Sequence, residues 1–320
     1  MSSSAQDVPT VAGRDAEAAS PTKAPWETWI EEDILPEIDP IMNASTIKLL
    51  NVIRTLLKAP DDDFEAASRA VSEYQSYFRS TYLDKESKDG WYLRNLPENG
   101  SSLIDPLCRY SWEIASMFPA DSAKHRRLAE LVAGFKKPAP QPFDPEDPQL
   151  MFDDNIASGT ARQIWDQFRV DGPYTGQIEE EYKDRCNKWL SAAGFMARLL
   201  DLGIFGGPEL IWVFRDLEDG LGQPSIGRDG DCKEIIGWQC QAAVAAQYMF
   251  IAGHVIVEEI KFPTQKWVAP RTPETWKAWT AALEKIAGTS LEDAQWDLKS
   301  KARLAHDKMI RLWPDLFGDE

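Results

Sequence analysis

Hydrophobic residues gather most densely in two long stretches, residues 178–201 and 231–259. The second stretch is apolar on almost every side, because alanine, valine, isoleucine and methionine fill most of residues 234–257. A helix with so little polar surface must be covered by its neighbours. The pattern therefore predicts two long helices at the centre of a multi-helix bundle.

The most apolar run of the second stretch, residues 242–257, is interrupted by Gln247 and His254. It is also shorter than the roughly 18 to 20 residues that a membrane span needs, so we expect a core helix and no membrane span. Helical geometry puts Cys240, Gln247 and His254 on one stripe. Buried polar groups need hydrogen-bond partners, which either neighbouring helices or a wet pocket would supply. The pattern favours the neighbouring helices.

The first stretch is amphipathic. Its apolar face carries Tyr182, Cys186, Trp189, Ala193 and Met196, and its opposite face carries Glu180, Asp184, Asn187, Ser191 and Arg198. A polar helix face is either exposed to solvent or turned into a cleft, and charged residues favour solvent.

Shorter helical patterns cover most of the remaining chain. We expect a helix to end before Pro60, and a second one to follow it, capped by Asp61 to Asp63, with Phe64 on its inner face. Asp121 is expected to cap a helix over residues 122–135, whose basic run at 124–127 predicts a solvated face.

The C-terminal part predicts a helical hairpin. Its first helix begins at Pro273, with Trp276 and Trp279 as packing anchors, and its second begins near Ser290. The proline-rich residues 138–148 predict a connector that crosses the surface as a strap, and residues 1–25 predict a disordered tail. Because no segment alternates with period two, we predict an all-α fold, with residues 26–320 as one domain.

Composition narrows the class of protein. The chain has 320 residues, 43% of them hydrophobic, with 13 tryptophans, which is enough for a sizeable core. Its 52 acidic against 35 basic residues give a net charge of -17, which argues against nucleic-acid binding. Four cysteines without a CxxC pair, and no signal sequence, are typical of a cytoplasmic protein with reduced thiols.

Asp153 and Asp154, followed by Asn155, form a group of candidate metal ligands. Adjacent carboxylates beside an amide are the ligand types that Mg²⁺ accepts. A DDxxD motif would place another carboxylate near Ser158, where none stands. Acidic residues at a helix start also cap free N–H groups, and this alternative is favoured.

Three stretches carry a resemblance to a known family. They are KWLSAAGFMARL at residues 188–199, AAQY at 245–248 followed by Ala252 and Gly253, and TPETW at 272–276 followed by Trp279. They resemble a fungal helical family catalogued as a domain of unknown function, and the likeness covers most of the chain after the tail. The resemblance implies an all-helical fold and an association with secondary-metabolite gene clusters, including one for oxopyrrolidine compounds. It implies no catalytic residues.

A looser likeness, in size and helical content, is to fungal sesquiterpene cyclases of the humulene type. It implies a lyase that draws diphosphate from a farnesyl-type substrate with Mg²⁺ and stabilises carbocations on aromatic faces. Under this hypothesis the candidate metal ligands are Asp153, Asp154, Asn187 and Ser191. The candidates for binding the substrate are Arg162, Arg198, Gln247 and His254, and those for the catalytic cavity are Trp189, Phe195, Trp212, Trp238 and Tyr248.

The cyclase hypothesis departs from the usual pattern, because the second metal motif lacks its glutamate and has Phe195 at that position. The main alternative is therefore a non-catalytic helical protein that binds a pathway enzyme or a hydrophobic intermediate. A third hypothesis gives His254 the role of general base, because histidine titrates near neutral pH.

Overall fold

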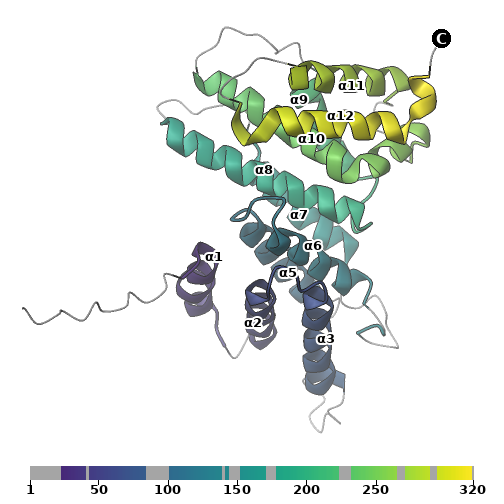
Figure 1. The fold of residues 1–320 in the computed structure, drawn as a ribbon. Helices are drawn as coiled ribbons and strands as arrows, with labels where there is room; N and C mark the ends of the chain where they lie inside the picture. The colour runs from purple at the N-terminus through teal and green to yellow at the C-terminus, as the bar shows by residue number, and fades with distance from the viewer. Residues whose placement is uncertain are drawn as a thin grey trace, which may run out of the picture.

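The computed structural model describes residues 23–40, 43–83, 101–138, 141–143, 152–170, 178–222, 232–264, 271–288 and 294–318. Throughout these ranges the regular structure is helical, without a strand, which confirms the all-α prediction. The described residues fit a single helical bundle (Figure 1). Residues 1–22 of the expected tail lie outside the described ranges.

The N-terminal half begins with α1 (Pro25–Thr28), which continues through a π-helical segment (Trp29–Ile34) and a 3-10 turn (Leu35–Glu37). It continues with α2 (Ala44–Lys58), α3 (Ala66–Phe78) with a π-helical extension (Arg79–Leu83), α5 (Ser101–Ala115), α6 (Ala123–Lys136) and α7 (Asp154–Phe168). The C-terminal half contains α8 (Glu179–Asp201), α9 (Leu210–Leu221), α10 (Cys232–Lys261), α11 (Pro273–Gly288), a 3-10 turn (Gln295–Asp297), α12 (Leu298–Leu312) and a 3-10 turn (Pro314–Leu316).

Helix α8 joins two groups of helices. In Figure 1 it crosses the molecule between α1, α2 and α3 on one side and α9 to α12 on the other. It packs against α10 on the second side and against α5, α6 and α7 on the first. With 23 residues in α8 and 30 in α10, the two predicted long helices form and pack against each other.

Helix α10 has a kink in its interior. Ala252 departs from helical geometry, with φ −107° and ψ 15°. Just before the kink, the Lys308 ammonium on α12 donates to the carbonyls of Phe250 (2.7 Å) and Ile251 (3.1 Å). Lys308 therefore supplies hydrogen bonds at the point where the helical ladder is disturbed.

The same helix has the length and composition of a membrane span. Among the described residues, the stretch from Ile236 to Lys261 has a mean hydropathy of 1.4 in its most apolar window, and 72% of that window is buried in the fold. The apolar stretch is therefore longer than residues 242–257, the run expected from the sequence. Such burial is typical of a core helix, and the absence of a membrane span stays a prediction.

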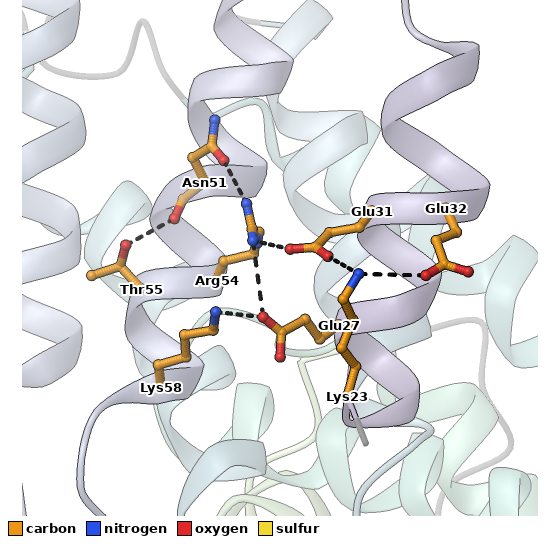
Figure 2. A network of polar contacts seen from close by, with 8 residues as sticks. All are labelled: Lys23, Glu27, Glu31, Glu32, Asn51, Arg54, Thr55 and Lys58. Carbon is orange, nitrogen blue, oxygen red and sulfur yellow. Dashed lines mark hydrogen bonds and ion pairs between the residues drawn. The ribbon is translucent and has the colours of Figure 1, made fainter. Parts of the chain in front are cut away.

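Ion pairs hold the N-terminal segment on α2 (Figure 2). Glu31 faces both Arg54 of α2 and Lys23, and Glu27 pairs with Lys58. The buried ring of Trp26 lies 6.4 Å from the ring of Phe118, which follows α5. The network therefore helps to seat α1 against the turn between α5 and α6.

The basic run at residues 124–127 differs from the prediction. His125 and Arg127 are buried, with 0% and 1% of their surface exposed. The Arg127 guanidinium donates to the carbonyls of Ala59 (2.8 Å) and Asp63 (3.2 Å), which satisfies the end of α2 and the loop after it. The cap of α6 is Ser122, not Asp121, because the Ser122 hydroxyl accepts the backbone N–H of His125.

Two further helix starts were predicted wrongly. Phe64 is 74% exposed below the Arg126 guanidinium, and the side chains of Asp61 to Asp63 do not cap α3, whose N-cap position is Glu65. Helix α12 begins at Leu298, because Trp296 and Asp297 adopt positive φ of 57° and 52° and interrupt the chain. Ser290 lies outside the described residues.

The hairpin of α11 and α12 is confirmed, and Trp276 and Trp279 are buried within it. The part of the proline-rich connector that is described, residues 141–143, lies on α3 and α6, where Phe143 is buried beside the rings of Tyr74 and Phe135. The rest of residues 138–148, apart from Pro138, lies outside the described ranges.

Candidate functional site

A groove with a volume of about 850 Å³ lies where the two groups of helices meet. It is bounded by α8, α10, α12 and residues 116–121, which form the turn between α5 and α6. A cavity of this size is within the range of small-molecule sites, roughly 300 to 1,000 Å³. Pro25 of α1 also lines it, so the ion pairs of Figure 2 help to position one edge.

The walls of the groove expose large apolar side chains. Met117 (36% exposed), Phe250 (47%) and Leu304 (47%) come from three different elements and all line it. Three of the six most exposed large hydrophobic side chains among the described residues are thus gathered in one depression. An exposed apolar patch of this kind is typical of a binding site, whereas single exposed apolar residues are ordinary.

The floor of the groove is polar, and its side chains form hydrogen bonds to other parts of the protein. The Gln247 amide donates to the carbonyl of Leu190 at 3.1 Å, and the Ser191 hydroxyl donates to the carbonyl of Phe118. Both side chains are buried. At the edge, the indole of Trp296 donates to the Asn187 side-chain oxygen at 2.6 Å.

Three successive carbonyls of α8 accept a second hydrogen bond from another helix. Leu190 accepts from Gln247 of α10, Ser191 from His125 of α6 (2.9 Å) and Ala192 from Trp112 of α5 (3.3 Å). Because a carbonyl oxygen can only accept, the Nε2 of His125 carries a proton, and its buried Nδ1, which has no described partner, matches the neutral ring. Burial lowers the pKa of His125 to about 4, which agrees with this neutral form.

The charged side chains of the groove differ in how far they are exposed to solvent. Asp121 and Asp297 are exposed at its edge, and Asp184 pairs with Lys188 at 2.8 Å. Arg198 and Lys301 are partly buried, and burial lowers the pKa of both side chains. The Arg198 guanidinium donates to the carbonyl of Ala120 at 2.8 Å. The acidic groups are therefore at the rim and the less hydrated charges are basic.

The four candidate metal ligands do not gather at one place. Asp153 caps α7, because its carboxylate accepts the backbone N–H groups of Asn155 (2.8 Å) and Ile156 (3.2 Å). Asp154 is exposed and pairs with Lys136. Neither residue lines the groove, whereas Asn187 and Ser191 do. No group of three or more His, Cys, Asp or Glu side chains placed to hold a metal ion occurs within the described ranges. The structure therefore does not bring the four predicted ligands to one site, and binding of Mg²⁺ stays a prediction.

The five candidate cavity aromatics also lie away from the groove and belong to the helix packing. Trp189 and Trp212 both pack on Trp165, with ring centroids at 6.0 and 6.3 Å. Phe195 meets Trp112 edge-on at 5.2 Å. Tyr248 is fully buried and Trp238 is half-buried.

Two of the four candidate substrate-binding residues line the groove, Arg198 and Gln247. Arg162 is exposed on α7 near Asp166, at 3.9 Å. His254 is exposed with its ring nitrogen 3.7 Å from the carboxylate of Asp201, so the stripe that it shares with Gln247 runs from the core to the surface. The thiol of Cys240, at the buried end of that stripe, contacts the carbonyl of Cys186 at 3.5 Å.

Sequence reasoning missed several groove residues, including Met117, Phe250, Trp296, Lys301 and Leu304. Lys301 and Leu304 lie next to positions of the apolar repeat that packs α12, so their spacing along the chain gives no sign of a groove. Phe250 could have indicated the groove. It is a large apolar residue on a helix that was expected to be covered by its neighbours.

A second buried polar cluster lies outside the groove and joins α7 to α9. The indole of Trp165 donates to the Asp216 carboxylate at 2.9 Å, and Arg169 is 3.5 Å from the same carboxylate and also pairs with Asp219. Burial raises the pKa of Asp216 to about 7 in spite of these contacts. The Tyr248 hydroxyl has no partner in hydrogen-bond geometry among the described residues, and its burial, together with nearby Asp216, raises the pKa of this phenol.

Comparison with known proteins gives a family and no further relative. No curated protein and no solved structure matches the chain. A family model described as a protein of unknown function, DUF3632, matches residues 111–298, from α5 to the first residue of α12. The match covers more than half of the chain and includes α8 and α10. The chain therefore belongs to the DUF3632 family.

Proposed function

We propose that this protein binds a hydrophobic small molecule in the groove between α8, α10 and α12, and does so without catalysing a reaction. The observation that carries the proposal is the convergence of Met117, Phe250 and Leu304, all partly exposed, on one cavity. Covering such surface gains roughly 25 cal/mol for each Å² of apolar area removed from water. A ligand with an apolar body would therefore be held by these walls.

Binding is favoured over catalysis because three uncharged polar side chains of the groove are already used by the fold. The side chains of Ser191, Gln247 and Asn187 hold hydrogen bonds to neighbouring elements. A catalytic acid, base or nucleophile needs a reactive group within reach of its substrate. These contacts support a scaffold that shapes the groove.

The setting expected from the sequence is part of the proposal. The protein would act in the cytoplasm, in fungal secondary metabolism, and would hold a hydrophobic intermediate for a pathway enzyme. The resemblance of residues 188–199 and 245–248 to the fungal family supports this setting, and both stretches contribute residues to the groove.

The sesquiterpene cyclase remains a separate prediction with less support. It needs metal ligands and aromatic faces around one cavity. Asp153 caps a helix and Trp189 packs in the core, away from the groove. Incubation of the protein with farnesyl diphosphate and Mg²⁺, followed by gas chromatography, tests it: a sesquiterpene hydrocarbon formed only by active protein would replace the binding proposal.

Calorimetric titration with decan-1-ol, an uncharged molecule with an apolar tail, tests the binding proposal itself. We expect saturable binding to the wild type, and its loss in Leu304→Trp, where the larger ring fills the groove. Met117→Trp fills it from the turn between α5 and α6, and Phe262→Trp is a matched control because Phe262 is exposed but does not line the groove. Absence of binding to the wild type, or equal binding by all four proteins, would overturn the proposal.

A further inference from the structure

Lys301 is a partly buried charged residue of the groove that has no partner among the described residues. It lies on α12 beside the apolar wall formed by Leu304, and it is partly buried. Its ammonium makes no hydrogen bond or ion pair with any residue that the structure describes. A partly buried cation loses part of its hydration, and without a hydrogen bond or an ion pair this loss is compensated only weakly.

The other basic groups of the groove each have a partner, although the Nε of Arg198 is buried without one among the described residues. Lys188 pairs with Asp184, and Arg198 donates to the carbonyl of Ala120. Asp121 and Asp297 lie close enough to Lys301 to favour its charged form, but neither forms an ion pair with it. Both carboxylates are exposed, so water solvates them and weakens their attraction for the ammonium.

An anionic group of a ligand would supply the missing partner. An ammonium and a carboxylate form a charge-assisted hydrogen bond, which is stronger where water is excluded. The apolar side chains beside Lys301 would exclude water once a ligand covers them. The groove thus has a cationic group, Lys301, beside its apolar walls.

We propose that the ligand of this groove is an amphiphilic monocarboxylate, whose apolar tail lies along Met117, Phe250 and Leu304 and whose carboxylate accepts a hydrogen bond from Lys301. The inference rests on the proposed function and specifies its ligand. A cationic amphiphile is the opposite possibility, because Asp121 and Asp297 stand at the rim. The less hydrated position of Lys301 decides for the anion, since a Coulomb interaction strengthens as the surrounding dielectric falls.

Three probes with the same tail separate these possibilities by calorimetry at pH 7 and fixed salt: decanoate, decan-1-ol and decylammonium chloride. We expect decanoate to bind about tenfold more tightly than decan-1-ol, and decylammonium to bind more weakly than either. Lys301→Met should bring decanoate down to the affinity of decan-1-ol, and Lys301→Arg should keep the preference. Lys299→Met is the matched control, because Lys299 is on the same helix but does not line the groove.

The result separates this inference from the proposed function. Equal binding of decanoate and decan-1-ol to the wild type, or an unchanged preference in Lys301→Met, would overturn the role of Lys301 while leaving the groove as a binding site. Binding of none of the three probes would overturn both. Tighter binding of decylammonium would assign the polar end of the site to the acidic rim and contradict the inference.

Discussion

The backbone of Gly194 leaves the space that the Gln247 amide occupies. A side-chain carbon at position 194 would lie 2.0 Å from Gln247 Nε2 and 2.7 Å from the side chain of Ala120. Gln247 uses this space to donate to the carbonyl of Leu190 on the same face of α8. One glycine therefore allows α8 to meet both α10 and the turn between α5 and α6, which together form the floor of the groove.

Gly194→Ala should destabilise the protein by about 1 to 3 kcal/mol, because the added methyl group crowds a closely packed contact. Urea unfolding measures the change. Gly159→Ala is the control: Gly159 is also within a helix, with open space around it, so alanine there should stabilise by about 0.5 to 1 kcal/mol. Equal effects of the two substitutions would contradict the packing role of Gly194.

Asp216 predicts a pH dependence with a definite sign. Its pKa is about 7 in the folded protein against 3.8 ordinarily, so the folded state binds the additional proton. The contribution of this carboxyl to the free energy of unfolding is therefore present below pH 4 and is lost as the pH rises toward 7. In Asp216→Asn the side chain does not titrate, so the variant should gain stability relative to the wild type between pH 5 and pH 8.

Urea unfolding of both proteins at those two pH values provides the measurement. Asp219→Asn is a suitable comparison, because Asp219 also pairs with Arg169 but is more exposed, with 36% of its side chain accessible. A difference between wild type and Asp216→Asn that does not change with pH would show that Asp216 keeps its ordinary pKa.

His125 predicts the opposite dependence. Its folded pKa of about 4 is below the ordinary 6.5, so the unfolded state binds the proton more readily. The contribution of this ring to stability is present above pH 6.5 and is lost as the pH falls toward 4. His125→Gln keeps an N–H donor near the carbonyl of Ser191 without titrating, and should lose less stability than the wild type between pH 7 and pH 5.

Thermal unfolding at the two pH values, followed by circular dichroism, is the measurement for His125. His254→Gln is the control, because His254 is exposed and its removal should leave the acid sensitivity of the fold in place. If His125→Gln and the wild type lost equal stability on acidification, the buried imidazole would not be a source of the acid sensitivity.

Lys308 should stabilise the kink of α10. Lys308→Met removes the donor to the carbonyls of Phe250 and Ile251 and should cost about 1 kcal/mol, since the side chain is only partly buried. Lys299→Met, on the same helix, should change the free energy of unfolding by less than about 0.5 kcal/mol. Similar losses in both variants would mean that the lysine contacts at the kink contribute little.

The spacing of apolar residues was enough to predict the long helices and the hairpin, because each helix has an apolar face that must be buried. Trp276 and Trp279 lie three residues apart and are both buried where α11 packs. Local charge was a poor guide to burial. Arg127 belongs to a basic run, yet the carbonyl groups that bind it are at the end of α2, distant along the chain.

The groove could not be predicted for a related reason. Its walls come from α10, α12 and the turn at residues 116–121, and no spacing within one segment encodes their meeting. The aromatic residues chosen from the sequence were the ones most suited to the core, and Phe195 and Trp189 lie there. Residues such as Leu304, which are apolar but left exposed, become visible only when the packing of the helices is known.

Photo-crosslinking with a diazirine analogue of decan-1-ol tests the central claim most directly, because mass spectrometry of the digested protein identifies the residues that the bound tail contacts. The account predicts crosslinks on residues 116–121 and around Phe250 and Leu304, all of which an excess of unlabelled decan-1-ol suppresses. Saturable crosslinks confined to other surfaces, or none that the unlabelled alcohol suppresses, would contradict it.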